Sequence, residues 1–368
     1  MSAKLLTKAS FGVSGTTFLW ALSSVVVGVA IGFDLIFGHS PTVAQSIAMP
    51  IVVCFAISAS LGRWAVPWLQ DLKTGQIIRE EGPQAHQMKA GTPTMGGLFF
   101  IPVALLVGAI ATNFSISVLA AIGLTLLYGA IGWLDDWRVI QRKSNKGISP
   151  RTKLILQVGG AIVFALWLFT HHAPDITTIH FPFGLALPLG VLFWLLAGFV
   201  PVAQSNATNF TDGLDGLAAG TAALTFLGLA ILTAASSPDL MILSACLSGA
   251  CLGFLVYNRN PARVFMGDTG SLAMGGAMAA IALISGQLFG LLILSGIFFA
   301  ESLSVMLQVG YFKATKDENG TGKRLFKMAP LHHHFELSGW SELKVVGTFY
   351  GVTVVLMAIA IGLCGHYA

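Results

Sequence analysis

The chain has 368 residues, of which 55% are hydrophobic and only 10% are charged. Soluble domains contain about 25% charged residues, so this composition excludes an ordinary soluble protein and indicates a polytopic membrane protein. The net charge is only +4. We interpret it as loops that face anionic lipids and anionic substrates, and we expect no nucleic acid among the partners.

Apolar runs predict the helices. A helix crosses the ~30 Å hydrocarbon core of a bilayer with about 20 residues. Runs of this kind predict an all-α fold with eleven transmembrane segments, at about 17–37, 47–66, 95–112, 115–133, 154–170, 187–204, 217–234, 240–257, 271–286, 287–310 and 345–365. A signal peptide is the alternative for the first run, but its length and the lack of a cleavage pattern favour a helix.

The basic residues predict the orientation. If the eleven segments alternate, all 20 Lys and Arg residues fall on one side of the membrane. The positive-inside rule makes that side cytoplasmic, with the N-terminus in and the C-terminus out. The polar motifs fall on the same side, so we expect an active site at the cytoplasmic face.

Two acidic motifs stand out among these loops. Asp135 and Asp136 end the 115–133 run, and adjacent carboxylates repel unless a cation or proton separates them. An acidic pair facing water is the alternative. Residues 206–215 repeat a polar side chain every three positions, on one face of a helical turn. The members of this row are Asn206, Asn209, Asp212 and Asp215. Such a row can bind Mg²⁺, sugar hydroxyls or a base edge. Capping of the next helix is the alternative, but it explains only one of the four residues.

Two further motifs complete the polar set. The sequence GDTGS at 267–271 opens an apolar helix, whose N-H groups suit a phosphate, and Asp268 suits a hard metal ion. Three consecutive histidines follow in the last basic loop, at His332, His333 and His334. They cannot all face one metal on a helix, so phosphate or sugar contacts with one histidine as acid or base are expected, and an exposed polar tract is the alternative.

The glycine-bounded cations near these motifs are Lys89 and Lys143, and we expect them to bind phosphate. Arg151 and Lys153 are explained by the positive-inside bias alone. Carboxylates, amides and cations on an apolar scaffold indicate phosphoryl transfer from a soluble nucleotide to a lipid, with Mg²⁺ as the fitting ion. A secondary transporter would use Glu301 inside its run, but we interpret Glu301 as a hydrogen-bonded residue facing the bundle or the site.

Five ordered strings carry a family resemblance: GTPTMGG, GWLDDW, NATNFTDGLDGLA, NRNPARVFMGDTGS and PLHHHFE. From about Pro50 to the C-terminus the chain resembles the phospho-N-acetylmuramoyl-pentapeptide-transferases, within the polyprenyl-phosphate N-acetylhexosamine-1-phosphate transferases. The triple histidine before Phe-Glu favours this branch over the GlcNAc-1-phosphate branch, which is the alternative.

The resemblance implies transfer of phospho-MurNAc-pentapeptide from UDP-MurNAc-pentapeptide to undecaprenyl phosphate in the bacterial inner (plasma) membrane, giving lipid I and UMP with Mg²⁺. It implies that Asp135 is the base or nucleophile, that Asp136 supports the site, and that Asp268 binds the metal. His332 would act in turnover. The implied substrate-binding residues are Lys89, Lys143, Asn206, Asn209, Asp212, Asp215, Phe265, His333 and His334.

The family has ten helices, the number that this chain has from residue 47 onward. We therefore expect an extra transmembrane helix and connector at 1–46 and a ten-helix catalytic domain at 47–368. A homodimer is compatible with the sequence, which does not fix the oligomeric state.

Overall fold

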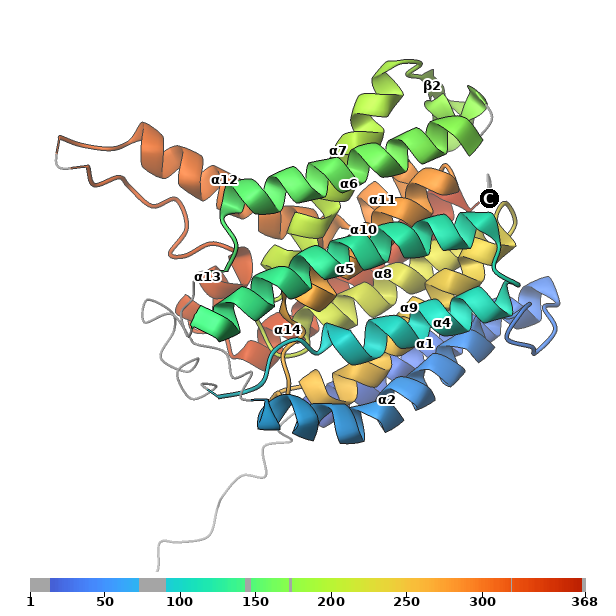
Figure 1. Cartoon of the computed structure of the whole chain (residues 1–368), viewed down its shortest axis with the longest axis horizontal. Helices are drawn as coiled ribbons and strands as arrows, with labels where there is room; N and C mark the ends of the chain where they lie inside the picture. The colour runs from blue at the N-terminus through green and yellow to red at the C-terminus, as the bar shows by residue number, and fades with distance from the viewer. Residues whose placement is uncertain (1–13, 73–90, 143–146, 172–173, 319, 366–368) are drawn as a thin grey trace, which may run out of the picture.

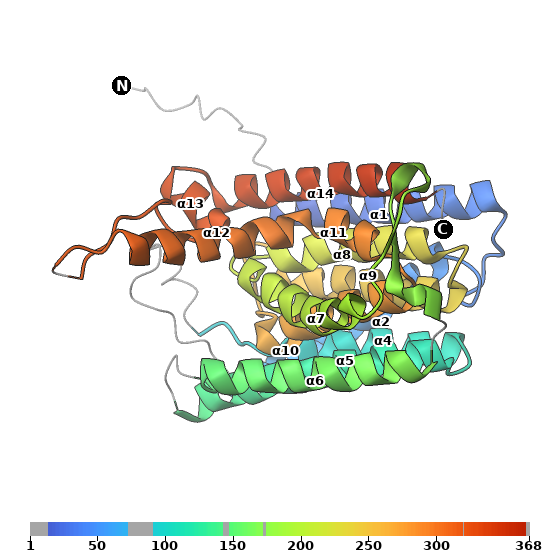
Figure 2. The same ribbon diagram turned by 90° about the horizontal axis from the view of Figure 1, so that it is seen from above.

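The computed structural model describes residues 14–72, 91–142, 147–171, 174–318 and 320–365. This part of the chain is a bundle of roughly parallel and antiparallel helices with one small hairpin (Figures 1 and 2). The helices are α1 Gly15–Phe37, α2 Ala48–Asp71, α4 Gly97–Ala111, α5 Ile116–Arg142, α6 Pro150–His171, α7 Leu192–Thr211, α8 Leu217–Thr233, α9 Pro238–Asn258, α10 Gly267–Ile284, α11 Leu288–Leu294, α12 Gly296–Ala314, α13 Leu331–Leu337 and α14 Glu342–Cys364.

The hairpin lies between α6 and α7. Its strands are β1 Thr178–His180 and β2 Ala186–Pro188, which pair antiparallel with Ile179 opposite Leu187. Short 3-10 turns flank β1, at Pro174–Thr177 and Pro182–Gly184. The expected segment at 187–204 is therefore corrected at its start, because the chain is extended there and the helix begins only at Leu192.

Seven of the described helices are long and apolar enough to cross a membrane, and α11 with α12 makes an eighth if that bent pair is one span. This result confirms an all-α polytopic membrane protein. The expected run at 287–310 is not one straight helix, since α11 and α12 meet at an angle of 72°. Two further apolar helices, α4 and α8, are shorter.

Three helices form the centre of the bundle. Almost every residue of α8, α9 and α10 is buried. Helices that are apolar on all sides belong in such a position, whereas a helix at the rim buries one face. Around this centre, α5 and α7 pack on α10, α2 and α4 pack on α9, and α14 packs on α8. The ends of α5, α7 and α10 are thereby brought together.

Polar contacts gather at one end of the bundle. At this end the start of α6 meets the start of α10, where Lys153 pairs with Asp268, and Arg259 after α9 donates to Thr16 of α1 at 3.0 Å. The α12–α13 segment lies at this end too, while the described C-terminal residues lie at the other (Figure 2). The described cations therefore concentrate where the motif-bearing helix ends meet.

The first two helices are joined at the opposite end by Asp34. Its carboxylate accepts hydrogen bonds from the Ser46 hydroxyl at 2.7 Å and from the main-chain N-H groups of Ile47 and Ala48, both at 2.9 Å. The last turn of α1 thus supplies the acceptor that the first turn of α2 needs.

Gly132 sets the spacing of α5 and α10. A methyl group at this position would collide with the Asp268 carbonyl oxygen, whereas one at Gly123, on the exposed side of α5, would meet nothing within 4 Å. We predict that Gly132→Ala destabilises the protein by about 1–3 kcal/mol through overpacking. Gly123→Ala is the matched control and should be neutral or slightly stabilising.

Thermal unfolding in detergent measures both variants. Equal midpoints for the two would contradict a close α5–α10 contact at Gly132.

Candidate functional site

Asp136 is buried between α5 and α10. Its carboxylate accepts hydrogen bonds from the main-chain N-H groups of Asp268 at 3.2 Å and Thr269 at 3.0 Å, and from the Thr269 hydroxyl at 2.6 Å. The first N-H groups of a helix have no partner within the helix, and an acidic side chain there is also favoured by the helix dipole. Asp136 therefore holds the start of α10 against α5.

Asp268, next to this contact, receives polar groups from two more helices. One carboxylate oxygen forms an ion pair with Lys153 Nζ of α6. The other accepts a hydrogen bond from Asn209 Nδ2 of α7 at 2.7 Å, and the same amide reaches Ser271 Oγ at 2.9 Å. With both partners bound, the Asp268 carboxylate is still partly exposed at the polar end of the bundle.

Asp135 points to a different neighbour from Asp136, because consecutive residues lie about 100° apart on a helix. It accepts a hydrogen bond from the Ile148 N-H at 3.0 Å. It also lies close enough to Asp268 and Lys153 for the charges to interact. The two adjacent aspartates therefore do different things: Asp136 is fixed in the helix contact, and Asp135 borders the open side of the site.

Asp212 completes the acidic group at the end of α7. Burial, and then the negative charges of Asp268 and Asp136, raise the pKa of Asp212 to about 8. We call Asp135, Asp136, Asp212 and Asp268 the carboxylate cluster. Among the described residues, Lys153 forms an ion pair with one member of the cluster, Asp268, so the cluster keeps an excess of negative charge that favours a cation.

Mg²⁺ suits this donor set. The described residues contain no group of three or more His, Cys, Asp or Glu side chains placed to hold a metal ion by themselves. Mg²⁺, however, commonly takes one or two carboxylates and completes its shell with water and substrate phosphates. Asp135 and Asp268 are both partly exposed and lie near each other, so they fit that pattern.

Two members of the polar row at 206–215 lie apart from the cluster. Asn206 donates to Gln157 Oε1 of α6 at 3.0 Å. Asp215 is buried, and its carboxylate accepts from Asn260 Nδ2 at 3.1 Å and the Ala262 N-H at 3.0 Å. Asp215 thereby holds the loop after α9, so these contacts indicate a scaffolding position; its contact with a nucleotide stays a prediction.

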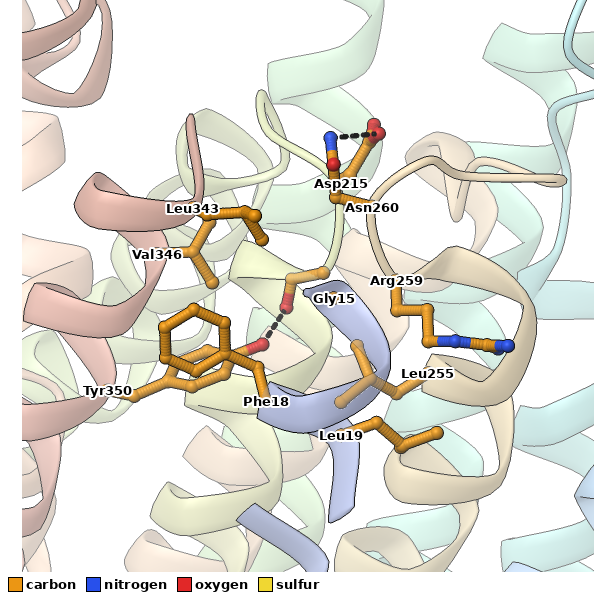
Figure 3. A pocket seen from close by; sticks show the side chains of 11 residues that line it. Gly15, Phe18, Leu19, Asp215, Leu255, Arg259, Asn260, Leu343, Val346 and Tyr350 are labelled. Atoms are coloured by element: carbon orange, nitrogen blue, oxygen red, sulfur yellow. Dashed lines mark hydrogen bonds between the residues drawn. The ribbon is translucent and has the colours of Figure 1, made fainter. Parts of the chain in front are cut away.

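Helix α1 packs behind this loop. Figure 3 shows Gly15, Phe18 and Leu19 of α1 beside Asn260 and Tyr350, with the Asp215–Asn260 hydrogen bond above them. The Tyr350 hydroxyl donates to the Gly216 carbonyl at 2.6 Å. Helix α1 therefore contacts the back of the polar motifs.

The three histidines point in three directions. His332 is buried and pairs with Glu301 of α12. His333 Nδ1 lies 3.0 Å from Glu336, and His334 Nδ1 accepts from the Lys327 N-H at 3.2 Å. The interpretation of Glu301 as a hydrogen-bonded residue of the bundle is confirmed. The prediction that the histidines cannot share one metal agrees with this divergence.

The GTPTMGG string supports the start of α10. The Phe265 N-H donates to the Pro93 carbonyl at 2.7 Å, and the N-H groups of Gly96 and Gly97 donate to the carbonyls of Phe265 and Met266 at 2.9 and 3.1 Å. Phe265 itself is half-buried beside Asp268. The GTPTMGG string thus fixes the backbone position of Phe265, and its contact with the substrate stays a prediction.

The lysine found at the site is not one of those predicted to bind phosphate. Lys89 and Lys143 lie outside the described residues, so their predicted phosphate contacts stay predictions. Lys153, which the positive-inside bias was sufficient to explain, instead contacts Asp268. The available signal was its position in the first turn of a helix that follows the Asp135–Asp136 motif, but a single sequence does not show which way that turn faces.

An apolar helical bundle with a carboxylate cluster and a paired lysine at one end suits a membrane-embedded enzyme of the phosphotransferase class. The comparisons with known proteins agree: residues 118–286 match the family model of glycosyl transferase family 4, and residues 89–101 match the phospho-N-acetylmuramoyl-pentapeptide-transferase signature 1. Relatives that are 57–58% identical over nearly the whole chain show that it belongs to the phospho-N-acetylmuramoyl-pentapeptide-transferase family.

Those relatives cover nearly the whole chain. The protein of that name from Nostoc punctiforme is 58% identical over 362 residues, which is 98% of this chain and 100% of the relative. Its counterpart from Picosynechococcus sp. is 57% identical over 351 residues, covering 94% of this chain and 95% of the relative. These matches confirm the resemblance found in the motifs, and they do not favour the GlcNAc-1-phosphate branch.

Lys153 and Arg151 offer a matched pair, since both lie in the first turn of α6 but only Lys153 contacts the carboxylate cluster. We predict that Lys153→Met lowers turnover by about 10²-fold or more, the usual cost of removing a group that stabilises charge in a transition state. Arg151→Met should leave the rate nearly unchanged, because Arg151 is exposed. Steady-state rates of purified variants test this, and equal losses for both would contradict it.

The raised pKa of Asp212 predicts a dependence of stability on pH. In the unfolded chain this carboxyl ionises near pH 4, whereas in the fold it stays protonated up to about pH 8. The free-energy cost of keeping it neutral therefore grows as pH rises from about 4 to about 8. Asp212→Asn removes that cost, so the variant should gain a few degrees of thermal stability over the natural protein at about pH 8 and less at about pH 5.

The control is Asp71→Asn at the exposed end of α2. Differential scanning calorimetry in detergent, without ligand, measures the unfolding midpoint of both variants at each pH. A stability difference for Asp212→Asn that is the same at both pH values would contradict the prediction.

Proposed function

We propose that the chain transfers phospho-MurNAc-pentapeptide from UDP-MurNAc-pentapeptide to undecaprenyl phosphate, forming lipid I and UMP for peptidoglycan biosynthesis. The observation that carries the proposal is the carboxylate cluster with Lys153 at the polar end of a transmembrane bundle. The name shared by the relatives supports the same reaction. An acidic centre at a membrane surface suits a reaction whose donor is soluble and whose acceptor is a lipid.

The proposed setting is the bacterial inner (plasma) membrane. The polar end of the bundle would face the cytoplasm, with the N-terminus in, the C-terminus out, and ten family helices at 47–368 following one extra helix at 1–46. The grouping of cations at this end supports that orientation through the positive-inside rule. The contact between Arg259 and Thr16 is consistent with it, because it brings the start of α1 to the same end.

The reaction proposed at the site is an in-line displacement. An oxygen of the lipid phosphate attacks the β-phosphorus of the UDP-sugar, the bond to the bridging oxygen breaks, and UMP leaves with the electron pair. Since a phosphate monoester has its second pKa near 6, most of the acceptor is already a dianion at neutral pH. Asp135 would remove the remaining proton, and a covalent phospho-aspartate at Asp135 is the alternative route.

The other residues of the site bind and orient. Asp268 and Asp135 would hold Mg²⁺, which when bound neutralises phosphate charge. Lys153 keeps Asp268 in place and contributes positive charge, and Asp136 fixes the helix on which Asp268 stands. The proposed substrate contacts are those expected from the sequence, and they concern Lys89, Lys143, Asn206, Asn209, Asp212, Asp215, Phe265, His332, His333 and His334.

Release of UMP tests the proposal. Purified protein is incubated with UDP-MurNAc-pentapeptide, undecaprenyl phosphate and Mg²⁺, and UMP and the lipid product are measured by chromatography. We expect release that needs both the lipid and Mg²⁺, and we expect Asp135→Asn to lower it by about 10³-fold. Omission of the lipid and addition of a chelator are the controls.

UDP-GlcNAc in place of the muramoyl donor distinguishes the two branches. Release from UDP-GlcNAc alone would assign the chain to the GlcNAc-1-phosphate branch. No release from either donor would overturn the enzymatic proposal.

A further inference from the structure

Glu301 and His332 form a buried pair between α12 and α13. Glu301 is fully buried, and His332 is 1% exposed. One carboxylate oxygen accepts the His332 main-chain N-H at 3.2 Å, and the other lies 3.1 Å from the ring atom Nδ1. A carboxylate that holds both the backbone and the ring of one histidine fixes the position and the rotation of that ring.

The other ring nitrogen is left without a partner. His332 Nε2 is buried and has no hydrogen-bond partner among the described protein groups. A buried polar atom in this condition is costly, and in an active site it commonly awaits a ligand. In the His332 ring, Nδ1 is therefore paired with Glu301, and Nε2 is available to a ligand.

The contact with Gly213 shows where His332 Nε2 points. A Cβ added at Gly213 would collide with His332 Nε2. Gly213 directly follows Asp212 of the carboxylate cluster, in the turn between α7 and α8. The free nitrogen of His332 thus faces the turn that carries Asp212, and only a glycine there leaves room for the ring.

We infer that Glu301 is a positioning residue for the transfer reaction, and that it acts by presenting His332 Nε2 to the phosphate groups of the substrate. This inference rests on the proposed function. With Nδ1 bonded to the carboxylate, the proton of the neutral ring resides on Nδ1 and the lone pair on Nε2. In its protonated form the same nitrogen donates a hydrogen bond to a phosphate oxygen.

The position of Glu301 inside an apolar helix is a second argument that its side chain has a function. A carboxylate inside an apolar helix of a membrane protein is expensive and is retained where it has a function. Here it lies in α12, shortly after the 72° bend that separates α12 from α11. A hydrophobic residue at this position would pack at no such cost but would leave the His332 N-H and ring unsupported.

Glu301→Gln tests the inference. The amide keeps the shape of the side chain but cannot accept both hydrogen bonds. We expect kcat to fall about 10–100-fold, as for other partners that orient a functional histidine, with KM for the UDP-sugar nearly unchanged. Ser304→Ala is the control: Ser304 lies on the same helix, is buried, and bonds to the Glu301 carbonyl rather than to His332.

A double variant separates positioning from general stability. If Glu301 acts through His332, then Glu301→Gln adds no further loss of kcat to a His332→Asn protein. Fully additive losses would overturn the inference. Because Glu301→Gln could fail to fold, Gly213→Ala provides an independent variant: its methyl group displaces the ring from the other side, and it should lower kcat without any change at Glu301. A normal kcat for Gly213→Ala would also contradict the inference.

Nitrogen NMR of histidine-labelled protein gives a readout that needs no activity. The His332 signals are identified by their loss in His332→Asn. We expect Nδ1 to carry a proton in the natural protein, because it faces the Glu301 carboxylate, and we expect the Nδ1 and Nε2 signals to change in Glu301→Gln. Identical spectra would overturn the inference. If the spectra change as expected but the natural protein releases no UMP, the proposed function fails while the Glu301–His332 coupling stands.

Discussion

Asp136 ties two transmembrane helices together through the first peptide groups of one of them. Its carboxylate takes the N-H groups of Asp268 and Thr269 and the Thr269 hydroxyl. Asp136 and Thr269 are buried in the protein, so the acceptor for these groups must come from the protein itself. Its neighbour Asp135 points away from this contact and is partly exposed at the open side of the site. The rest of the site is arranged around the helix start that Asp136 fixes.

The carboxylate cluster concentrates negative charge that the protein only partly neutralises. Lys153 offsets one charge, and Asp212 responds by retaining its proton to a higher pH. A site of this kind is preorganised for a cation, because the repulsion between carboxylates is relieved when the ion arrives. The same cluster would repel the phosphates of a substrate that came without one. Under the proposed function, the substrate phosphates would therefore need a cation to accompany them into the site.

The apolar runs predicted the helices well, since long runs without charge have few alternatives in a membrane protein, and the acidic motifs located most of the site. The sequence could not show in which direction individual polar side chains point. Lys153 was assigned to topology although it contacts Asp268, and Asp215 was grouped with Asn209 although its carboxylate turns to the loop after α9. Both differences arise from the rotation of a helix end, which only tertiary packing decides. The bend between α11 and α12 falls at Ser295 and Gly296, a pair that permits a kink but does not by itself require one in an apolar run.

The hydrogen bonds of Asp34 concern the way the molecule is assembled. Asp34 at the end of α1 accepts hydrogen bonds from the Ser46 hydroxyl and from the N-H groups of Ile47 and Ala48 at the start of α2. These two helices therefore form a hairpin whose turn satisfies its own polar groups, and it can enter the bilayer as a unit while later segments are still being synthesised. The N-terminal helix would then be the first half of an insertion hairpin, a role in biogenesis that is separate from its contact with the finished site.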